Sequence, residues 1–190
     1  MKPIGQISEK AIAIHHDKLY AGYVAKKSAI RTELAALDPK ILEASNATYS
    51  AIRSLKDAET FAANGVSLHE WYFENIGGND TADENLPVVK ALAERFGSMD
   101  LFLKDMTACG MAARGWAVLA WDTHDKELHI YTGDAHNHGG VWGAIPLLVL
   151  DVYEHAYFMD YGADRAAYIA DAMAHVDWEI VNRRFEETVK

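Results

Sequence analysis

The stretch PLLVLDVYEHAYFMDYG, residues 146–162, joins a strand-like run to a pair of candidate metal ligands. The apolar residues 147–150 are typical of a β-strand, and Asp151 and His155 follow them directly, four positions apart. A carboxylate and an imidazole carried by one rigid element suit a redox metal in a nitrogen/oxygen site. The stretch therefore predicts half of a metal centre, provided that other histidines of the chain converge on it.

The composition is that of an ordinary globular protein with an acidic balance. The 190 residues are 50% hydrophobic and 24% charged, enough for one domain or two small ones. The net charge of −10 argues against binding to nucleic acid or to an anionic membrane. The single cysteine, Cys109, excludes an intrachain disulfide, and neither a signal-peptide pattern nor a membrane-spanning run is recognised. We expect a cytoplasmic protein.

The order of the predicted elements divides the chain into a helical half and a mixed half. Helical patterns cover residues 8–30, 40–63 and 68–75, with a break predicted at Asn64-Gly65. A polar link near residues 77–87 then leads to a second half that mixes both kinds of element. Its helices are expected at 87–96, 98–112, 165–174 and 177–187, and its strands at 115–121, 127–132 and 147–150. This pattern predicts the α+β class.

The histidines are the other candidate ligands, and they are scattered along the chain. His15 and His16 lie in the first predicted helix, His69 follows the predicted break, and His136 and His138 lie in a Gly-rich loop. Imidazole plus carboxylate without thiolate favours iron or manganese over a structural zinc. Neither His-His in a helix nor Asp and His four apart is a strong signal alone.

Five motifs, taken together, resemble the successive signatures of the iron/manganese superoxide dismutase family. They run in order over most of the chain: HHDKLYAGYV (15–24), HEWYF (69–73), GWAV (115–118), DVYEHAY (151–157) and VDWEIVNRRF (176–185). The resemblance implies an N-terminal helical hairpin domain, residues 1–80, and a C-terminal α/β domain, residues 87–190, with a three-stranded antiparallel sheet. It implies a metal site at the junction of these domains.

The resemblance also implies an activity and its ligands. The family disproportionates superoxide to oxygen and hydrogen peroxide by alternate reduction and oxidation of one Fe or Mn ion per subunit. By position, the four metal ligands fall on His15, His69, Asp151 and His155. Superoxide is then the substrate, and the ion is the cofactor.

The residues around these ligands follow the family in part. Tyr23 matches the active-site tyrosine at the substrate entrance, and Trp116 matches a tryptophan of the cavity wall. Phe73 and Tyr153 stand where the family usually has tryptophans, and these aromatic side chains are expected to keep the site dry. Glu154 matches a residue that pairs with a ligand histidine of the other subunit, which implies a homodimer.

Several positions depart from the family pattern. Leu19 and Phe158 replace a histidine and a tyrosine that meet across the dimer interface, so both ends of one polar contact are apolar. The effect of this change on activity is left open.

An outer-sphere glutamine of the family is also missing. Gly65 stands at one of its two possible places, and a histidine stands at the other, where His136 is the better match and His138 the alternative. A histidine there favours iron weakly. Arg165 matches an arginine near the substrate channel, and Lys18 is a second candidate for steering an anion into an acidic protein.

Two other interpretations remain at this point. The chain could be a dismutase-like, metal-binding stress protein with weak or no turnover, which the changes at Leu19, Tyr153 and Phe158 keep open. It could also be a helical interaction protein whose histidines are incidental. The sequence does not decide between iron and manganese, or between a dimer and a tetramer.

Overall fold

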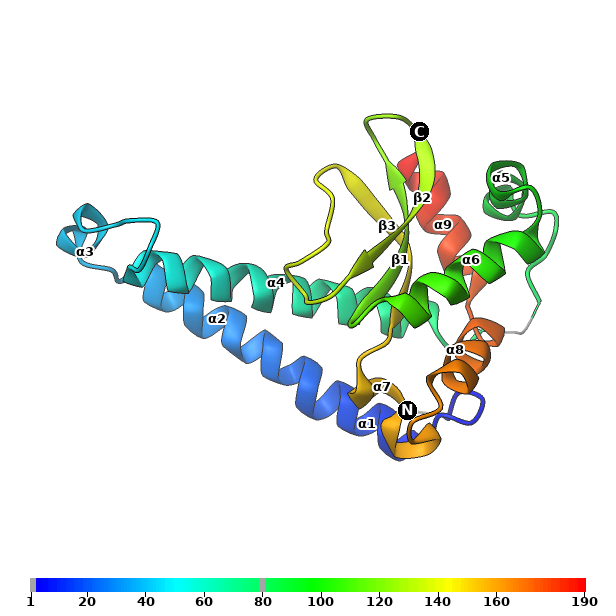
Figure 1. Cartoon of the computed structure of the whole chain (residues 1–190), viewed down its shortest axis with the longest axis horizontal. Coiled ribbons are helices and arrows are strands. Elements are labelled where there is room, and N and C mark those ends of the chain that lie inside the picture. The colour runs from blue at the N-terminus through cyan, green and yellow to red at the C-terminus, as the bar shows by residue number, and fades with distance from the viewer. Residues whose placement is uncertain (1–2, 79–80) are drawn as a thin grey trace.

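A long helical hairpin forms the first part of the molecule. The computed structural model describes residues 3–78 and 81–190. The first arm is one continuous helical run, and the return arm is α4, which lies antiparallel to α2 and packs against it (Figure 1). The elements are α1 (Glu9–Ile14), the π-helix η1 (His15–Tyr20), α2 (Ala21–Ala35), the short α3 (Pro39–Glu43) at the tip, and α4 (Ala51–Asn75).

The sequence predicted the first arm well and the second arm wrongly. Ser8 caps α1 by accepting a hydrogen bond from the backbone N–H of Ala11, as expected for a serine before a helix. The break predicted at Asn64-Gly65 is absent, because α4 runs through it as one helix of 25 residues. Glycine costs a helix about 1 kcal/mol relative to alanine, and here the tight packing around Gly65 outweighs that local preference.

The second part is an antiparallel sheet with helices, which confirms the predicted α+β class. The strands are β1 (Trp116–Asp122), β2 (Glu127–Gly133) and β3 (Ala144–Asp151), in the order β2-β1-β3. Strand β3 is longer than predicted and tolerates Pro146 because it is an edge strand with a register shift at that point. The helices are α5 (Pro87–Phe96), α6 (Met99–Ala112), α7 (Glu154–Tyr161), α8 (Arg165–Ala174) and α9 (Trp178–Thr188).

Side chains from the helices close the free edge of β3. The amide of Asn75, the last residue of α4, donates to the carbonyl of Val149 at 3.0 Å and accepts from its N–H at 2.9 Å. Arg184 of α9 donates to the carbonyl of Leu147 at 2.9 Å and to Asn75 at 3.2 Å. These bonds satisfy edge groups that would otherwise face an apolar interior, and they fix the hairpin against the sheet.

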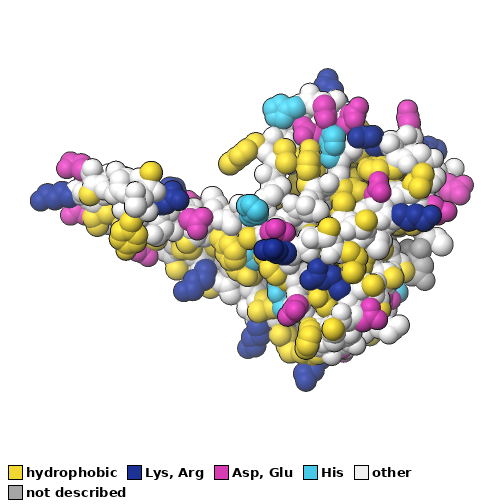
Figure 2. All heavy atoms as spheres, in the orientation of Figure 1, with side chains coloured by type: hydrophobic (Ala, Val, Ile, Leu, Met, Phe, Trp, Pro, Cys, Tyr) yellow, Lys and Arg dark blue, Asp and Glu magenta, His cyan; other side chains and the backbone are white. Residues whose placement is uncertain are grey.

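The main core lies between the sheet and helices α5, α6, α8 and α9. Its fully buried side chains include Leu92, Phe102, Met106, Leu119 and Ile169. In the part of the chain that the structure describes, no helix combines the length and the apolar character that a membrane crossing requires. Figure 2 shows Lys, Arg, Asp and Glu side chains interspersed on one face of the molecule, with the hairpin projecting from the rest.

Candidate metal centre

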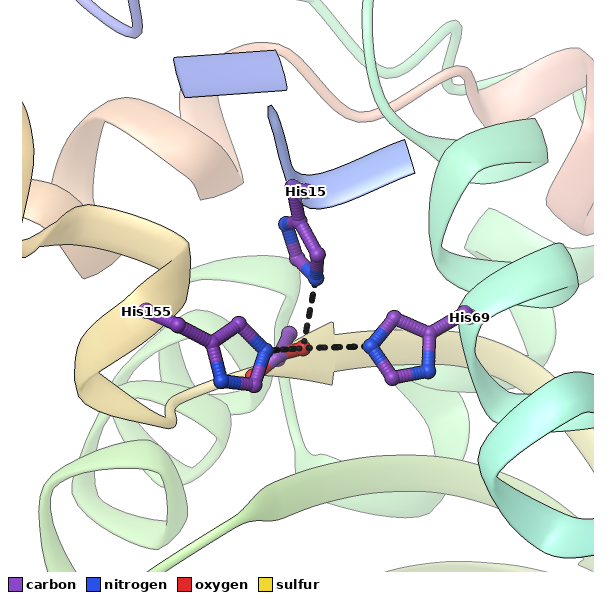
Figure 3. Close-up of side chains that lie close together, drawn as sticks. His15, His69 and His155 are labelled. Carbon is purple, nitrogen blue, oxygen red and sulfur yellow. Dashed lines mark hydrogen bonds and ion pairs between the residues drawn. The ribbon is translucent and has the colours of Figure 1, made fainter. Parts of the chain in front are cut away.

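Three imidazoles converge on one carboxylate where the hairpin meets the sheet. The Nε2 atoms of His15, His69 and His155 lie 3.2, 3.6 and 3.3 Å from the same atom, Oδ2 of Asp151. Figure 3 shows the three rings pointing inward from three different helical segments. Residues that are up to 140 positions apart in sequence, 155 − 15, therefore meet at one point. The structure brings together all four residues that the sequence predicted as ligands.

Local structure holds each ring in place. His15 begins η1, a π-helical turn, and such wide turns inside α-helices often occur at functional sites. His69 lies inside α4, where its Nδ1 donates to the carbonyl of Gly65 at 2.5 Å. That bond fixes the tautomer and leaves the Nε2 lone pair of His69 pointing at Asp151. Asp151 ends β3, and its Oδ1 accepts from the N–H of Tyr153 at 2.9 Å.

The electrostatics of the cluster favour a bound cation. Burial opposes the charge of Asp151, but contacts with His15 and His155 outweigh it and hold the pKa of this carboxyl far below its usual range. Burial lowers the pKa of His69 to about 4, so its ring is neutral near pH 7. Burial also opposes the charge of His155, but Asp151 outweighs this effect and raises the pKa of that ring. The cluster thus joins a buried carboxylate to a buried neutral imidazole, His69, and both are donors that a metal cation accepts.

Two buried nitrogen atoms without hydrogen-bond partners indicate that the four residues can hold a metal ion. Nε2 of His15 and Nε2 of His69 are inaccessible to solvent and have no well-formed hydrogen bond, although an unpaired buried polar atom normally costs 1–3 kcal/mol. Donors about 2.1 Å from a common ion lie roughly 3.0–4.2 Å apart, which agrees with the separations of 3.2–3.6 Å observed here. The residues present therefore fit a single metal ion.

Aromatic side chains enclose the cluster. The indole of Trp116 meets the ring of His69 edge-on at 5.1 Å, and Phe73 meets His15 edge-on at 5.0 Å. Tyr153 stacks on His155 at 5.3 Å with an interplanar angle of 14°. A Cβ atom on Gly115 would lie 2.7 Å from the Tyr153 ring, so glycine at this position makes room for the tyrosine. The predicted wall residues thus do line the site.

His136 is buried beside the ligands, whereas His138 is exposed. The indole N–H of Trp116 donates to Nδ1 of His136 at 3.0 Å. The ring of His136 lies 5.6 Å from that of His69 and 4.7 Å from that of Tyr23. Burial lowers the pKa of His136 to about 4, so the ring is neutral near pH 7. The structure thus separates the two candidates that the sequence left open.

Gly65 explains how His136 and Tyr23 fit side by side. A Cβ atom at residue 65 would lie 3.0 Å from Cδ1 of Tyr23 and 3.2 Å from Cδ2 of His136. A side chain from α4 and the ring of His136 therefore compete for the same volume. Burial and the charge of Asp151 raise the pKa of Tyr23, so its hydroxyl keeps its proton at neutral pH.

The remaining predicted residues lie at the surface or are engaged elsewhere. Glu154 is exposed, and Phe158 is 57% exposed. Leu19 is half-buried. The guanidinium of Arg165 donates to the Tyr157 hydroxyl at 3.1 Å and to the carbonyl of Ala113 at 2.9 Å, so its role in steering stays a prediction. Lys18 is exposed on η1.

Two buried tyrosines were missed by sequence reasoning. Tyr72 and Tyr168 touch each other through their hydroxyl groups, and Tyr168 also contacts the backbone of Asp151. The available signal was weak: Tyr72 follows His69 by three residues, so it shares a helix face with that ligand. Nothing in the local sequence places Tyr168 near Asp151.

Comparison with known proteins identifies the family. Residues 84–184 match the family model for iron/manganese superoxide dismutases, C-terminal domain. The chain is 38% identical to a protein from Aquifex pyrophilus named as an Fe superoxide dismutase, over 97% of this chain and 86% of that protein. It is 34% identical to an Fe superoxide dismutase of Cupriavidus metallidurans over all of this chain and 98% of the relative.

The similarity extends to proteins named for manganese. One of them, Mn superoxide dismutase 2 of Haloferax volcanii, is 30% identical over 97% of this chain and 89% of its own length. The matched family model covers more than half of the chain and includes Asp151 and His155, and the relatives span His15 and His69 as well. The protein belongs to the iron/manganese superoxide dismutase family.

Proposed function

We propose that this protein disproportionates superoxide at one iron or manganese ion held by His15, His69, Asp151 and His155. The observation that carries the proposal is the pair of buried, unpartnered Nε2 atoms that face a carboxylate oxygen. Two superoxide anions and two protons give one dioxygen and one hydrogen peroxide, and the bound ion supplies the one-electron redox change. The chain itself must position the ion, admit the anion and deliver protons.

His136 is proposed as the outer-sphere residue that donates a hydrogen bond into the site. Its Nδ1 accepts from Trp116, and a neutral imidazole has one N–H, so the proton of His136 lies on Nε2. The lowered pKa, about 4, keeps this ring in the neutral form at physiological pH. A neutral ring with a fixed tautomer can donate one hydrogen bond to solvent or substrate without adding a charge.

Tyr23 is proposed as the proton donor at the entrance. Its ring is half-buried, 5.4 Å from that of His69 and 4.7 Å from that of His136. Its raised pKa keeps the phenol protonated, as a donor must be. Tyr153 adds a second phenol near the site, and its pKa is raised to about 12 by burial and by the charge of Asp151.

We favour iron over manganese. Support comes from His136, which occupies the volume beside Gly65 in place of a glutamine, and from the two relatives with the highest identity quoted above, which are named for iron. The similarity to manganese proteins means that the metal must be determined directly.

A homodimer is proposed with Glu154 at its interface. Glu154 is exposed beside the ligand His155, and Phe158 and Met159 of the same helix expose 57% and 50% of their surface. Exposed apolar side chains next to a site are typical of an interface. Changing Glu154 to Ala is expected to weaken dimerisation at least tenfold, because it removes a charged contact, and analytical ultracentrifugation would measure it.

Three finer assignments stay proposals. The division into domains 1–80 and 87–190 is supported by the separation of the helical hairpin from the sheet (Figure 1). Arg165 is proposed to steer superoxide through the guanidinium N–H groups that Tyr157 and Ala113 do not engage. A cytoplasmic location is proposed from the presence of one cysteine.

Metal reconstitution is the deciding experiment. Protein stripped of metal is loaded separately with iron and with manganese, and the metal content and the superoxide consumption are measured for each form. We expect about one ion per chain in both forms and higher turnover with iron. Full occupancy with no superoxide consumption would instead support the dismutase-like binding protein that the changes at Leu19, Tyr153 and Phe158 left open.

A further inference from the structure

Two buried tyrosine hydroxyls connect helix α4 to the backbone of Asp151. The hydroxyl of Tyr168, on α8, donates to the carbonyl oxygen of Asp151 at 2.6 Å. The hydroxyl oxygens of Tyr72 and Tyr168 lie 3.2 Å apart. Both side chains are buried. This pair therefore joins three elements, α4, α8 and the end of β3, at a carboxylate proposed as a metal ligand.

The hydrogen bonds of the pair run in one direction. A phenol has a single hydrogen to donate, and that of Tyr168 is committed to the carbonyl of Asp151. The hydroxyl of Tyr72 must therefore donate to the oxygen of Tyr168. Burial raises the pKa of both hydroxyls, so both stay neutral and the direction is kept at physiological pH.

Tyr72 also ties the pair to the histidine ligands. It follows His69 by three residues, which places both side chains on one face of α4. Its ring lies 5.5 Å from that of His15. A displacement of α4 relative to β3 would thus disturb the tyrosine pair and the ligand set together.

We propose that Tyr168 and Tyr72 are positioning residues, which set the orientation of Asp151 relative to His69; the proposal rests on the four-ligand site proposed above. Strand β3 ends at Asp151, where the carboxylate is turned toward the histidines. On one side, the N–H of Val152 donates to the carbonyl of Gly115 at 2.8 Å. Tyr168 holds the Asp151 carbonyl, so the peptide plane after the ligand is fixed at both of its polar atoms.

Conservative tyrosine-to-phenylalanine variants test the proposal, since they remove one oxygen and keep the ring. The set is Tyr168→Phe, Tyr72→Phe, the double variant, and Tyr131→Phe as a matched control. Tyr131 also donates its hydroxyl to a buried carboxylate, Asp122, at 2.8 Å, but at the opposite end of β1. The measurements are Mn²⁺ affinity by chelator competition, the visible spectrum of the iron-loaded protein, and the melting temperature of the metal-free protein.

Tyr168→Phe is expected to weaken Mn²⁺ binding roughly tenfold or more, as loss of an outer-sphere contact to a ligand does, and to shift the spectrum of the iron form. Tyr72→Phe is expected to weaken binding less, because the bond to Asp151 remains. The double variant should match Tyr168→Phe within about twofold, since Tyr72 acts through Tyr168 and the effects are not additive. The control should bind Mn²⁺ like the wild type.

Three results would overturn the proposal. The first is a Tyr168→Phe variant with unchanged affinity and spectrum but a lower melting temperature, which would make the pair merely structural. The second is full additivity in the double variant, and the third is equal weakening in the control. If Tyr168→Phe fails to fold, Tyr72→Phe decides: affinity equal to that of the wild type would overturn the proposal.

Failure of the proposed function gives a different pattern. Wild-type protein that binds Mn²⁺ and iron without consuming superoxide would refute the dismutase assignment. The Mn²⁺ affinities of the variants and the wild type would still test whether Tyr168 and Tyr72 position Asp151. Wild-type protein that retains neither metal would refute the ligand set and the positioning role together.

Discussion

Two Asp-His pairs with the same four-residue spacing lie at opposite ends of the sheet, and they differ in what surrounds them. Asp151 and His155 are joined by two further histidines, His15 and His69, whose buried Nε2 atoms lack a hydrogen-bond partner. Asp125 and His129, at the β1–β2 hairpin, make a shorter contact of 2.7 Å, but the Asp125 side chain is 51% exposed whereas that of Asp151 is fully buried. The spacing is the same, yet only one pair belongs to a set that needs an ion.

The charged groups at the hairpin pair already have protein partners. Asp125 accepts from the N–H of Glu127 at 3.0 Å as well as pairing with His129. The carboxylate of Glu127 pairs with Arg95 at 3.3 Å. An ion at this place would have to displace these partners, whereas in the Asp151 cluster it would satisfy two buried nitrogens, Nε2 of His15 and Nε2 of His69, that have no hydrogen-bond partner. Unpartnered buried nitrogens, rather than acid–histidine composition, therefore distinguish the two clusters.

The largest expected effect comes from removing the carboxylate of each pair in turn. Asp151→Ala is expected to lower metal affinity by more than the roughly 100-fold that loss of an outer-sphere contact can cost, and to abolish superoxide consumption. Asp125→Ala is the matched control and should keep the metal content and activity of the wild type. Elemental analysis after dialysis measures the metal content of both variants, and a superoxide consumption assay measures their activity. Equal metal loss in the two variants would erase the proposed difference between the pairs.

A second test uses acid, because burial holds two histidines at the site, His69 and His136, in the neutral form. The pKa values of His69 and His136 are about 4 in the folded protein, against about 6.5 in an unfolded chain. Between these values the unfolded state binds more protons, so stability falls as the pH falls from 6.5 to 4. The loss has an upper limit of about 3.4 kcal/mol per histidine, and partial solvent screening makes it smaller.

Urea unfolding of the metal-free protein at pH 7 and pH 4.5 measures this dependence. His136→Gln should show a smaller loss of unfolding free energy than the wild type, because one of the two histidines is gone. An identical loss in both proteins would mean that His136 is not held in the neutral form by burial.

The smallest effect concerns two helical glycines, one beside the site and one away from it. Gly22→Ala, in α2, meets no atom within 4 Å and should stabilise the protein by about 0.5–1 kcal/mol through helix propensity. Gly65→Ala should lack this gain, since its Cβ presses on Tyr23 and His136 at an overpacking cost of about 1–3 kcal/mol. Its superoxide turnover should fall several-fold while the metal is retained. Thermal melts and activity assays compare the two, and equal stabilisation would contradict the packing argument.

The sequence predicted helix ends and strands best where local chemistry marks them. Pro87 begins α5 and Gly97 ends it in a left-handed conformation, while Ser98 caps α6. Strands β1 and β2 were placed within one residue at each end. Helix α4 was predicted wrongly because a local Asn-Gly signal was given more weight than packing, which a sequence does not display. Helix α7 was not predicted at all, since its eight residues carry no clear amphipathic period.

By itself, the sequence determined the fold class, the family and the identities of the four candidate ligands, because these depend on local patterns and on motifs kept in order. The tertiary structure alone decided which Asp-His pair has unpartnered nitrogens, that His136 rather than His138 is buried at the site, and that Gly65 leaves room for it. It also revealed the pair of Tyr72 and Tyr168. Each of these features depends on contacts between residues far apart in the chain. Such contacts form only when the helical hairpin packs against β3, and no local sequence pattern encodes that packing.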